Sequence, residues 1–329
     1  MNRYAIEQKF KSLAAFLIIL ILLPYIVSVF VNGADVKEQD KEDAYVKVKV
    51  PDTEEADGVT ELKWTDYIAG ILAEEIQEDC ELETMKAQAV LIRTQIYRTL
   101  EESEDKILTE SYLSREEMED KWGAKEYRGY YEKYIRAVEE TDDTAVMYKD
   151  SYALTPFHQS SSGLTRSAAE VLGSNEYPYI AVRECPLDKE ADHEIQTFTF
   201  TCKEIQDLCR DFLVAEKDGE IAAKGYSFED FEISSLDSAG YVSELRIGST
   251  VCTGDQFRDA LALPSSAFSL SEDGGDSIKI TTTGKGHGLG MSIWTADQMA
   301  KEGKNYEEIL AFFFEGTELR NDIQETELL

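Results

Sequence analysis

Residues 64–100 read WTDYIAGILAEEIQEDCELETMKAQAVLIRTQIYRTL, and this stretch contains the strongest structural pattern in the chain. Apolar side chains at helical spacing predict one helix near Thr65–Ile76 and a second near Leu82–Leu100. Only residues 77–81 separate the two runs, so we expect the helices to pack as neighbours.

An acidic side chain continues the apolar stripe of the first helix. Glu75 follows Ile68 and Ile71 at the i, i+4, i+7 spacing, whereas Glu74 points about 100° away. Desolvation raises the pKa of a carboxyl group, and a general acid at neutral pH requires such a shift. Glu75 is therefore a candidate catalytic residue, although a carboxyl group that ends a helix and points to water fits the same pattern.

Two basic residues share one face of the second helix, because Lys86 and Arg93 lie seven positions apart. They could bind an anionic or hydroxyl-rich ligand beside Glu75. A solvated charged face with neighbouring glutamates is the other interpretation.

The rest of the chain alternates between helical and strand patterns. We predict a charged helical region at 101–140, a hairpin followed by a strand or loop at 144–158, strands at 196–202, 230–252 and 265–283, and a helix at 203–216. Ser292 opens a helix that Gly303 closes, and Asn305 with Glu308 forms a capping box for a last helix ending near Gly316. Without a regular βαβ repeat, this order predicts a mixed α/β (α+β) fold with helical and β-rich subregions.

The N-terminus predicts a membrane anchor. Residues 13–31 contain 19 residues without a charge, which is long enough to cross a bilayer. Basic residues precede this run and acidic residues dominate after it, which predicts a cytoplasmic N-terminus and an extracytoplasmic C-terminal domain. Cleavage within residues 31–34 is the alternative. We expect a tail and anchor at 1–33, an acidic extended linker at 34–60 and a single catalytic core at 61–329.

Composition excludes several classes of protein. The net charge of −33 repels phosphate backbones and anionic lipid, so neither a nucleic-acid binder nor a basic peripheral membrane patch is expected. The five cysteines form no CxxC motif, which makes a cysteine-based metal site improbable. We expect buried, unreactive thiols, and a disulfide remains open.

Neither the histidines nor the glycine-rich run matches a common catalytic motif. His158, His193 and His287 form no HxxxH pair, and no GxSxG elbow for a serine hydrolase occurs. Residues 284–290 read GKGHGLG, which lacks the third glycine of a dinucleotide fingerprint and is no P-loop. Alternating glycines let the backbone approach a ligand or another segment, and a tight structural turn is the alternative.

Three segments together resemble the stage II sporulation protein D family. The first pairs YIAGILAEEI at 67–76 with LETMKAQAVLIRT at 82–94. The second is FHQSSSGLT at 157–165, with YPY at 177–179 and PLD at 186–188 downstream. The third is GKGHGLGMS at 284–292, followed by AKEGKNYEEIL at 300–310. The likeness spans about residues 61–318.

This resemblance implies a peptidoglycan lytic transglycosylase that needs no cofactor and cleaves glycan strands lacking stem peptides. It also implies septal wall degradation during engulfment, with a membrane scaffold protein and an amidase as partners. The family's catalytic glutamate falls on Glu75. The residues expected to bind substrate are Lys86, Arg93, His158, Ser160, Ser161, Tyr179, His287 and Ser292.

The chain departs from the family where some members resemble zinc proteins. Ser161 and Leu164 offer no metal ligand there, so the zinc is not carried over. Two other functions remain open. A non-catalytic wall-binding activator of an amidase would keep the cleft and its basic residues without needing the Glu75 carboxyl group. A surface scaffold would depend on the acidic exterior instead.

Overall fold

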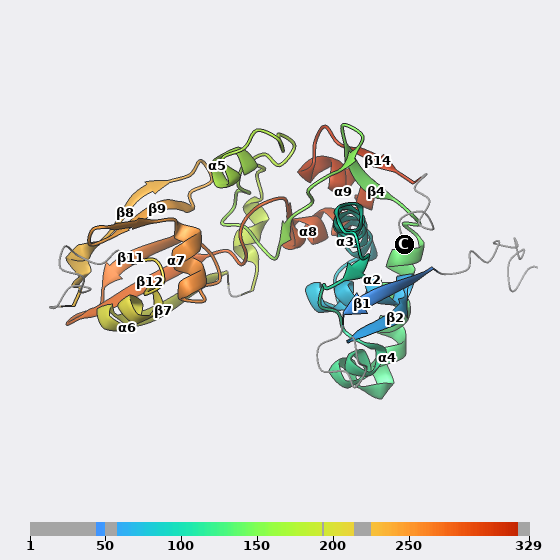
Figure 1. The fold of residues 1–329 in the computed structure, drawn as a ribbon, viewed down its shortest axis with the longest axis horizontal. Helices are drawn as coiled ribbons and strands as arrows, with labels where there is room; N and C mark the ends of the chain where they lie inside the picture. The colour runs from blue at the N-terminus through green and yellow to red at the C-terminus, as the bar shows by residue number, and fades with distance from the viewer. Residues whose placement is uncertain (1–43, 50–57, 193, 214–224, 322–329) are drawn as a thin grey trace, which may run out of the picture. The chain divides into compact units, whose positions relative to one another are not determined.

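The computed structural model describes residues 44–49, 58–192, 194–213 and 225–321 (Figure 1). Its longer helices are α2 (Trp64–Glu75), α3 (Leu82–Glu102), α4 (Arg115–Glu139), α8 (Ile293–Lys301) and α9 (Tyr306–Phe313). Shorter helices are α5 (Ala168–Leu172), α6 (Cys202–Leu208) and α7 (Gly254–Ala260). One subregion is mainly helical and another is mainly built of strands, which confirms the mixed α/β (α+β) prediction.

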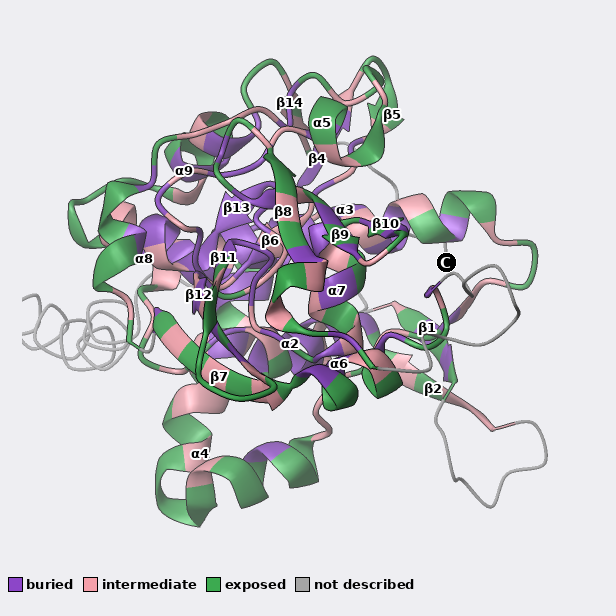
Figure 2. Ribbon diagram, turned by 90° about the vertical axis from the view of Figure 1, so that its left-hand side faces the viewer, coloured by how far each residue is buried: buried purple, intermediate pink, exposed green. Residues whose placement is uncertain are grey.

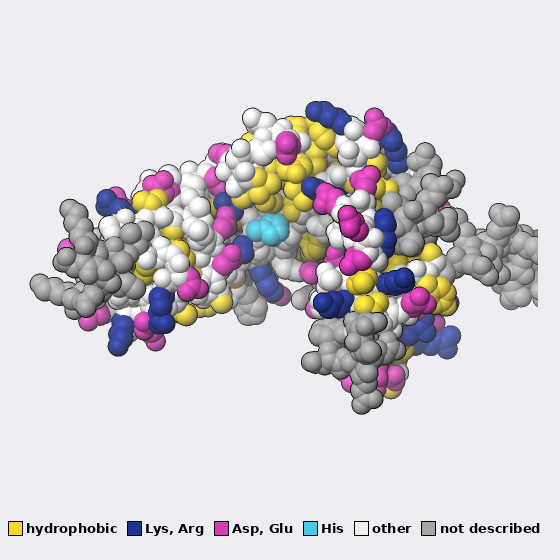
Figure 3. Space-filling model, in the orientation of Figure 1, with side chains coloured by type: hydrophobic (Ala, Val, Ile, Leu, Met, Phe, Trp, Pro, Cys, Tyr) yellow, Lys and Arg dark blue, Asp and Glu magenta, His cyan; other side chains and the backbone are white. Residues whose placement is uncertain are grey.

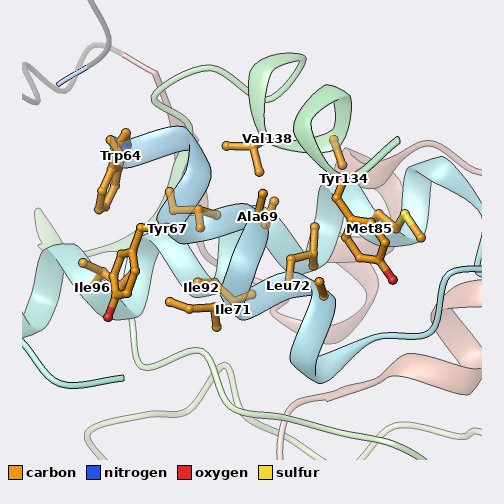
Figure 4. Close-up of a cluster of buried hydrophobic side chains, with 14 of the residues drawn as sticks. Trp64, Tyr67, Ala69, Ile71, Leu72, Met85, Ile92, Ile96, Tyr134 and Val138 are labelled. Atoms are coloured by element: carbon orange, nitrogen blue, oxygen red, sulfur yellow. The ribbon is translucent and has the colours of Figure 1, made fainter. Parts of the chain in front are cut away.

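The helical subregion is built on residues 64–100. Helices α2 and α3 begin and end close to the predicted positions, and both pack against α4. Figure 4 shows the buried cluster between them, in which Leu72, Met85 and Tyr134 come from the three different helices. Much of α4 is exposed, as Figure 2 shows, and Gly123 interrupts it with a φ of 75°.

The predicted linker extends too far. Strand β1 (Tyr45–Lys49) lies within residues 34–60 and pairs with β2 (Val59–Lys63) and β3 (Ile107–Leu108). Val46 and Val48 point into the helical core, while Tyr45, Lys47 and Lys49, which alternate with them, are exposed. The alternation of apolar and charged residues in YVKVK is the pattern of a half-buried strand. Residues 44–49 are therefore part of the folded domain.

The C-terminal helices cover the other side of α3. A hairpin of β4 (Ala145–Tyr148) and β5 (Ser151–Tyr152) confirms the predicted hairpin, and β14 (Glu318–Arg320) adds to its edge. Helices α8 and α9 pack against α3, and both form as predicted. Asn305 and Glu308 make the expected capping box at the start of α9.

The β-rich subregion contains two antiparallel three-stranded sheets around a buried cluster of their own. One sheet has the order β10 (Thr250–Cys252), β9 (Val242–Ile247), β8 (Phe231–Leu236). The other has the order β11 (Phe268–Glu272), β12 (Ser277–Thr283), β7 (Ile195–Thr201). These strands match the predicted ranges, whereas α6 ends at Leu208 and is shorter than expected. A short parallel pair joins β6 (Phe157–His158) to β13 (Met291–Ser292).

Other predictions concern the membrane and the cysteines. The anchor predicted at 13–31 lies outside the described residues, as does His193. Among the helices that the structure describes, none is long and apolar enough to cross a membrane. All five cysteines are free thiols, and all except Cys80 are buried, which agrees with the expectation of unreactive thiols.

Candidate active site

Glu75 is the last residue of α2, and its side chain is half-buried. Its carboxyl group makes no hydrogen bond or ion pair with any residue that the structure describes. Burial raises the pKa of this carboxyl group, and the charge of Glu74 raises the pKa further. Glu74 itself is exposed and accepts a hydrogen bond from Ser111 Oγ at 3.0 Å, so the two neighbouring carboxyl groups point in different directions, as predicted.

Two donors from elsewhere in the chain fix the end of α2. Lys121 Nζ donates to the carbonyl oxygen of Ala73 at 2.8 Å. Tyr134 donates to the carbonyl oxygen of Ile76, also at 2.8 Å. The last carbonyl groups of a helix lack partners within the helix, so these donors satisfy them and hold the backbone on both sides of Glu75. The helix C-terminus also carries partial negative charge, which further favours a protonated carboxyl group there.

Two hollows meet at Glu75. The first has a volume of about 540 Å³ and lies between the end of α2, the segment 157–159, the segment 258–264 and the glycine-rich run. The second, of about 590 Å³, lies over residues 74–79 and the face of α4 that presents Lys121 and Tyr130. Glu75, Gln159 and Lys285 line both hollows. The free carboxyl group of Glu75 therefore stands where a long ligand could extend in two directions.

His158 and His287 form one wall of the first hollow. Histidine side chains appear in cyan on the face that Figure 3 shows. Their ring centroids lie 5.9 Å apart. Nδ1 of His158 donates to the carbonyl oxygen of Leu289 at 3.0 Å, whereas Nδ1 of His287 accepts from the backbone N–H of the same residue at 3.0 Å. Burial lowers the pKa of His158 to about 3, and burial also lowers the pKa of His287. Both imidazoles are therefore neutral at pH 7.

Nε2 of His158 is an acceptor without a partner. Because Nδ1 carries the proton, Nε2 holds a lone pair, and no described residue donates to it. A buried polar atom without a partner costs free energy, and this one lies just beneath the surface of the hollow that His158 lines.

The glycine-rich run brings this wall together by lying against residues 156–160. A Cβ atom on Gly286 would lie 2.6 Å from Cβ of His158, and one on Gly290 would lie 1.9 Å from the carbonyl oxygen of Pro156. Lys285 N–H donates to the carbonyl oxygen of Ser160 at 2.9 Å. Of the two interpretations of this run, close approach to another segment is the one that the structure shows. Lys285 and His287 are thereby placed on the cleft.

The predicted serines lie behind the cleft wall and line neither hollow. Ser160 Oγ donates to Glu194 Oε2 at 2.6 Å. The backbone N–H of Ser161 and the hydroxyl group of Ser292 donate to opposite oxygens of Asp188, at 2.6 and 2.9 Å. Burial raises the pKa of Glu194 to about 7 and also raises the pKa of Asp188. These buried groups support the segment that carries His158 and Gln159.

Three other predicted substrate-binding residues have partners away from both hollows. Lys86 pairs with Glu83 and Glu140 at 2.7 and 2.5 Å. Arg93 is buried, and its guanidinium group donates to the carbonyl oxygens of Val138 and Thr144. The hydroxyl group of Tyr179 accepts from the backbone N–H of Leu154 at 2.8 Å. The structure brings Glu75, His158 and His287 together and leaves these three outside.

Sequence reasoning missed four residues of the cleft. Gln159 directly follows His158, and Lys285 lies within GKGHGLG. Their neighbourhood to these candidate motifs is a sequence signal that could have identified them. Arg258 and Asp259 form an ion pair at 2.6 Å at the end of α7, and no pattern in the sequence marks them.

A metal ion does not fit the described residues. No group of three or more histidine, cysteine or acidic side chains among them could hold one. The histidine pair supplies one unpartnered nitrogen, Nε2 of His158, and zinc sites in proteins use three or four protein ligands.

The chain is similar to known sporulation proteins. Residues 52–148 match the family described as Stage II sporulation protein. Stage II sporulation protein D of Bacillus subtilis (strain 168) is 28% identical over 265 residues, which cover 77% of this chain and 73% of that protein. Stage II sporulation protein D of Bacillus amyloliquefaciens is 26% identical over 274 residues, with the same two coverages. An uncharacterised protein of Brachyspira hyodysenteriae is 28% identical over 266 residues.

Proposed function

This chain belongs to the stage II sporulation protein D family, which is involved in sporulation, and from this premise we propose that it is a peptidoglycan lytic transglycosylase. The substrate is a glycan strand that lacks stem peptides, and the product ends in 1,6-anhydro-muramic acid. The observation that supports this proposal best is the unpartnered carboxyl group of Glu75, with its raised pKa, at the point where two hollows meet.

The first chemical step is protonation of the leaving group. The protonated Glu75 carboxyl group donates its proton to the glycosidic oxygen, and the bond between that oxygen and C1 of the muramic acid breaks. Positive charge develops on the sugar ring, as in other glycosidases. The neutral histidine wall adds no positive charge that would oppose it.

The second step uses Glu75 again. Its carboxylate accepts a proton from the C6 hydroxyl group of the same sugar, and the C6 oxygen bonds to C1. Proton donation and proton acceptance balance, so Glu75 returns to its protonated form. The nucleophile is tethered to the substrate, which gives it a high effective concentration and removes the need for an activated water.

Asp259 is the other described carboxyl group that lines the first hollow, and it is already engaged by Arg258. In the second hollow, Glu74 accepts from Ser111, while Glu78 and Asp79 line that hollow and not the first. A hydrolase needs a second carboxyl group for water or for nucleophilic attack. A mechanism that uses one carboxyl group fits this arrangement better.

We also propose a location and partners, which the resemblance and the N-terminal sequence support. We place the chain at the cell membrane with a single N-terminal anchor, a cytoplasmic N-terminus and an extracytoplasmic domain at the septum, where it degrades septal wall during engulfment. A membrane scaffold protein and an amidase would be its partners there. Labelling cysteines introduced before and after residues 13–31, with a reagent that does not cross membranes, tests this topology.

Product analysis tests the activity. The purified chain is incubated with peptide-free glycan strands, beside Glu75→Gln, and the new ends are identified by mass spectrometry. We expect 1,6-anhydro ends from the wild type and none from the variant. Binding of the strands without cleavage by the wild type would support the amidase activator instead, and reducing ends would identify a hydrolase.

A further inference from the structure

Lys285 is an unpaired positive charge on a strongly acidic protein. The chain has 66 acidic residues and a net charge of −33. Even so, no described carboxylate lies within ion-pair distance of Lys285 Nζ. Its side chain is exposed and lines both hollows beside Glu75.

The backbone of Lys285 is held more firmly than its side chain. Its N–H donates to the carbonyl oxygen of Ser160, and its own carbonyl oxygen accepts from the N–H groups of Gln159 and Ser160 at 3.1 Å. The ammonium group is therefore carried on a fixed backbone position and is left available for a ligand. Since it does not pair with Glu75, it also leaves that carboxyl group unpartnered.

The other charges in the first hollow cancel one another. Arg258 and Asp259 form an ion pair there, and the two histidines are neutral at pH 7. Lys285 is thus the uncompensated positive charge among the described residues that line this hollow. An uncompensated cation in a partly desolvated cleft favours an anionic group on the ligand.

The second hollow has the opposite character. Glu74, Glu78 and Asp79 line it together with the cations Lys121 and Lys285, so acidic groups are in excess there. An anionic group on the ligand is therefore repelled from the second hollow and drawn to the first. This difference gives the cleft a direction.

We infer that Lys285 binds the lactyl carboxylate of a muramic acid that has lost its stem peptide, with that sugar in the first hollow. This inference rests on the proposed transglycosylase function, and it identifies a residue that recognises peptide-free muramic acid. A stem peptide converts the lactyl carboxylate to a neutral amide, and N-acetylglucosamine carries no charge. A single lysine can therefore distinguish peptide-free muramic acid from both.

The test compares two forms of one strand. Peptide-free glycan strands are used directly or after their lactyl carboxylates have been converted to neutral amides. Binding of both forms is measured in the Glu75→Gln background by calorimetry, so that no cleavage occurs. We expect the acidic form to bind about tenfold more tightly than the amide form, a preference that weakens as salt is added.

Two variants identify the residue responsible. Lys285→Met in the same background should bind both forms with similar affinity, at the level of the amide form, and Lys285→Arg should retain the preference. Lys279→Met is the matched control, because Lys279 is an exposed lysine on β12 that lines neither hollow. It should keep the full preference. Equal unfolding temperatures for the three variants would show that all of them fold.

The outcomes separate this inference from the proposed function. The role of Lys285 would be overturned if the chain that retains Lys285 bound the acidic and amide forms equally. It would also be overturned if Lys285→Met kept the preference for the acidic form. A wild type that cuts no strand but still prefers the acidic form would overturn the transglycosylase and leave the recognition by Lys285 standing.

Discussion

Gln159 and Glu75 are joined by a hydrogen bond across 84 positions of the chain, in which Nε2 of Gln159 donates to the backbone carbonyl oxygen of Glu75 at 2.8 Å. The bond connects the segment that carries His158 to the end of α2. It makes Gln159 a positioning residue, since it acts on the backbone of Glu75 and leaves the carboxyl group free.

Loss of this bond should slow cleavage more than it weakens binding. Gln159→Ala leaves the Glu75 carbonyl oxygen without its donor, so the carboxyl group is held less well relative to the scissile bond. We expect kcat to fall about tenfold with a small change in KM, because misplacement of a catalytic group by a fraction of an ångström affects mainly the transition state.

Steady-state kinetics on peptide-free strands measures this effect. Gln95→Ala is the control, because Gln95 lies on α3 and lines neither hollow. A rise in KM with unchanged kcat would mean that Gln159 binds substrate and does not position Glu75.

The pH dependence of cleavage should depend on Glu74. Because burial and the charge of Glu74 raise the pKa of Glu75, activity that needs its protonated form should decline as the pH rises through that raised value. Glu74→Gln removes the neighbouring negative charge, which is the second cause of the shift after burial. The pKa of Glu75 should then fall, and the alkaline limb of kcat/KM should move to lower pH by a fraction of a unit.

A pH–rate profile of both chains decides this. Glu78→Gln is the comparison, since Glu78 also lines the second hollow but does not contribute to the raised pKa of Glu75. An alkaline limb that stays in place in Glu74→Gln would mean that Glu75 is not the group that titrates.

The sequence predicted most of the fold because its local patterns are strong. The helices at 64–75 and 82–102 and the capping box at Asn305 follow from periodicity and end chemistry, which depend on neighbouring residues. The linker prediction missed strand β1, because its alternating pattern is only five residues long and acidic residues surround it.

The site was harder to predict, because its residues come together from distant segments. Periodicity identified Glu75, but it could not distinguish a basic residue that faces a cleft from one that faces the core. Arg93 shares a helix face with Lys86, but that face packs on α4. There the guanidinium group of Arg93 donates to the backbone carbonyl oxygen of Val138. Lys285 lies on the cleft because the glycine-rich run forms backbone hydrogen bonds with Ser160. Contacts between such distant segments leave no local pattern in the sequence.

Gly290→Ala should destabilise the domain strongly. The new Cβ atom would lie 1.9 Å from the carbonyl oxygen of Pro156, and the φ of 70° is unfavourable for alanine. We expect a loss of about 3 kcal/mol or more in the free energy of unfolding, from overpacking and backbone strain together.

Gly274→Ala is the matched control for that change. Gly274 has a similar φ of 79°, but nothing lies within 4 Å of a Cβ atom built there. Its cost should be about 1 kcal/mol, from the backbone alone. Denaturant unfolding measures both, and equal losses would show that the approach to Pro156 is not tight.

Glu194 should make the domain less stable as the pH rises. Burial raises the pKa of this carboxyl group from 4.5 to about 7, and its side chain is 4% exposed. Between these two values the folded chain binds more protons than the unfolded chain, so the free energy of unfolding falls as the pH increases through this range. Above the folded pKa the loss is complete, and its upper limit is about 3 kcal/mol.

Glu194→Gln removes this titration but keeps an acceptor for Ser160 Oγ. The variant should therefore unfold with a shallower pH dependence between pH 5 and 8 and should be more stable than the wild type at pH 8, by roughly 1–3 kcal/mol. Asp188 has a raised pKa as well, so some slope should remain. Thermal unfolding of both chains across this pH range measures the difference. If the two slopes are the same, Glu194 is ionised in the folded domain at pH 5, and its buried hydrogen bond to Ser160 is made by the charged form.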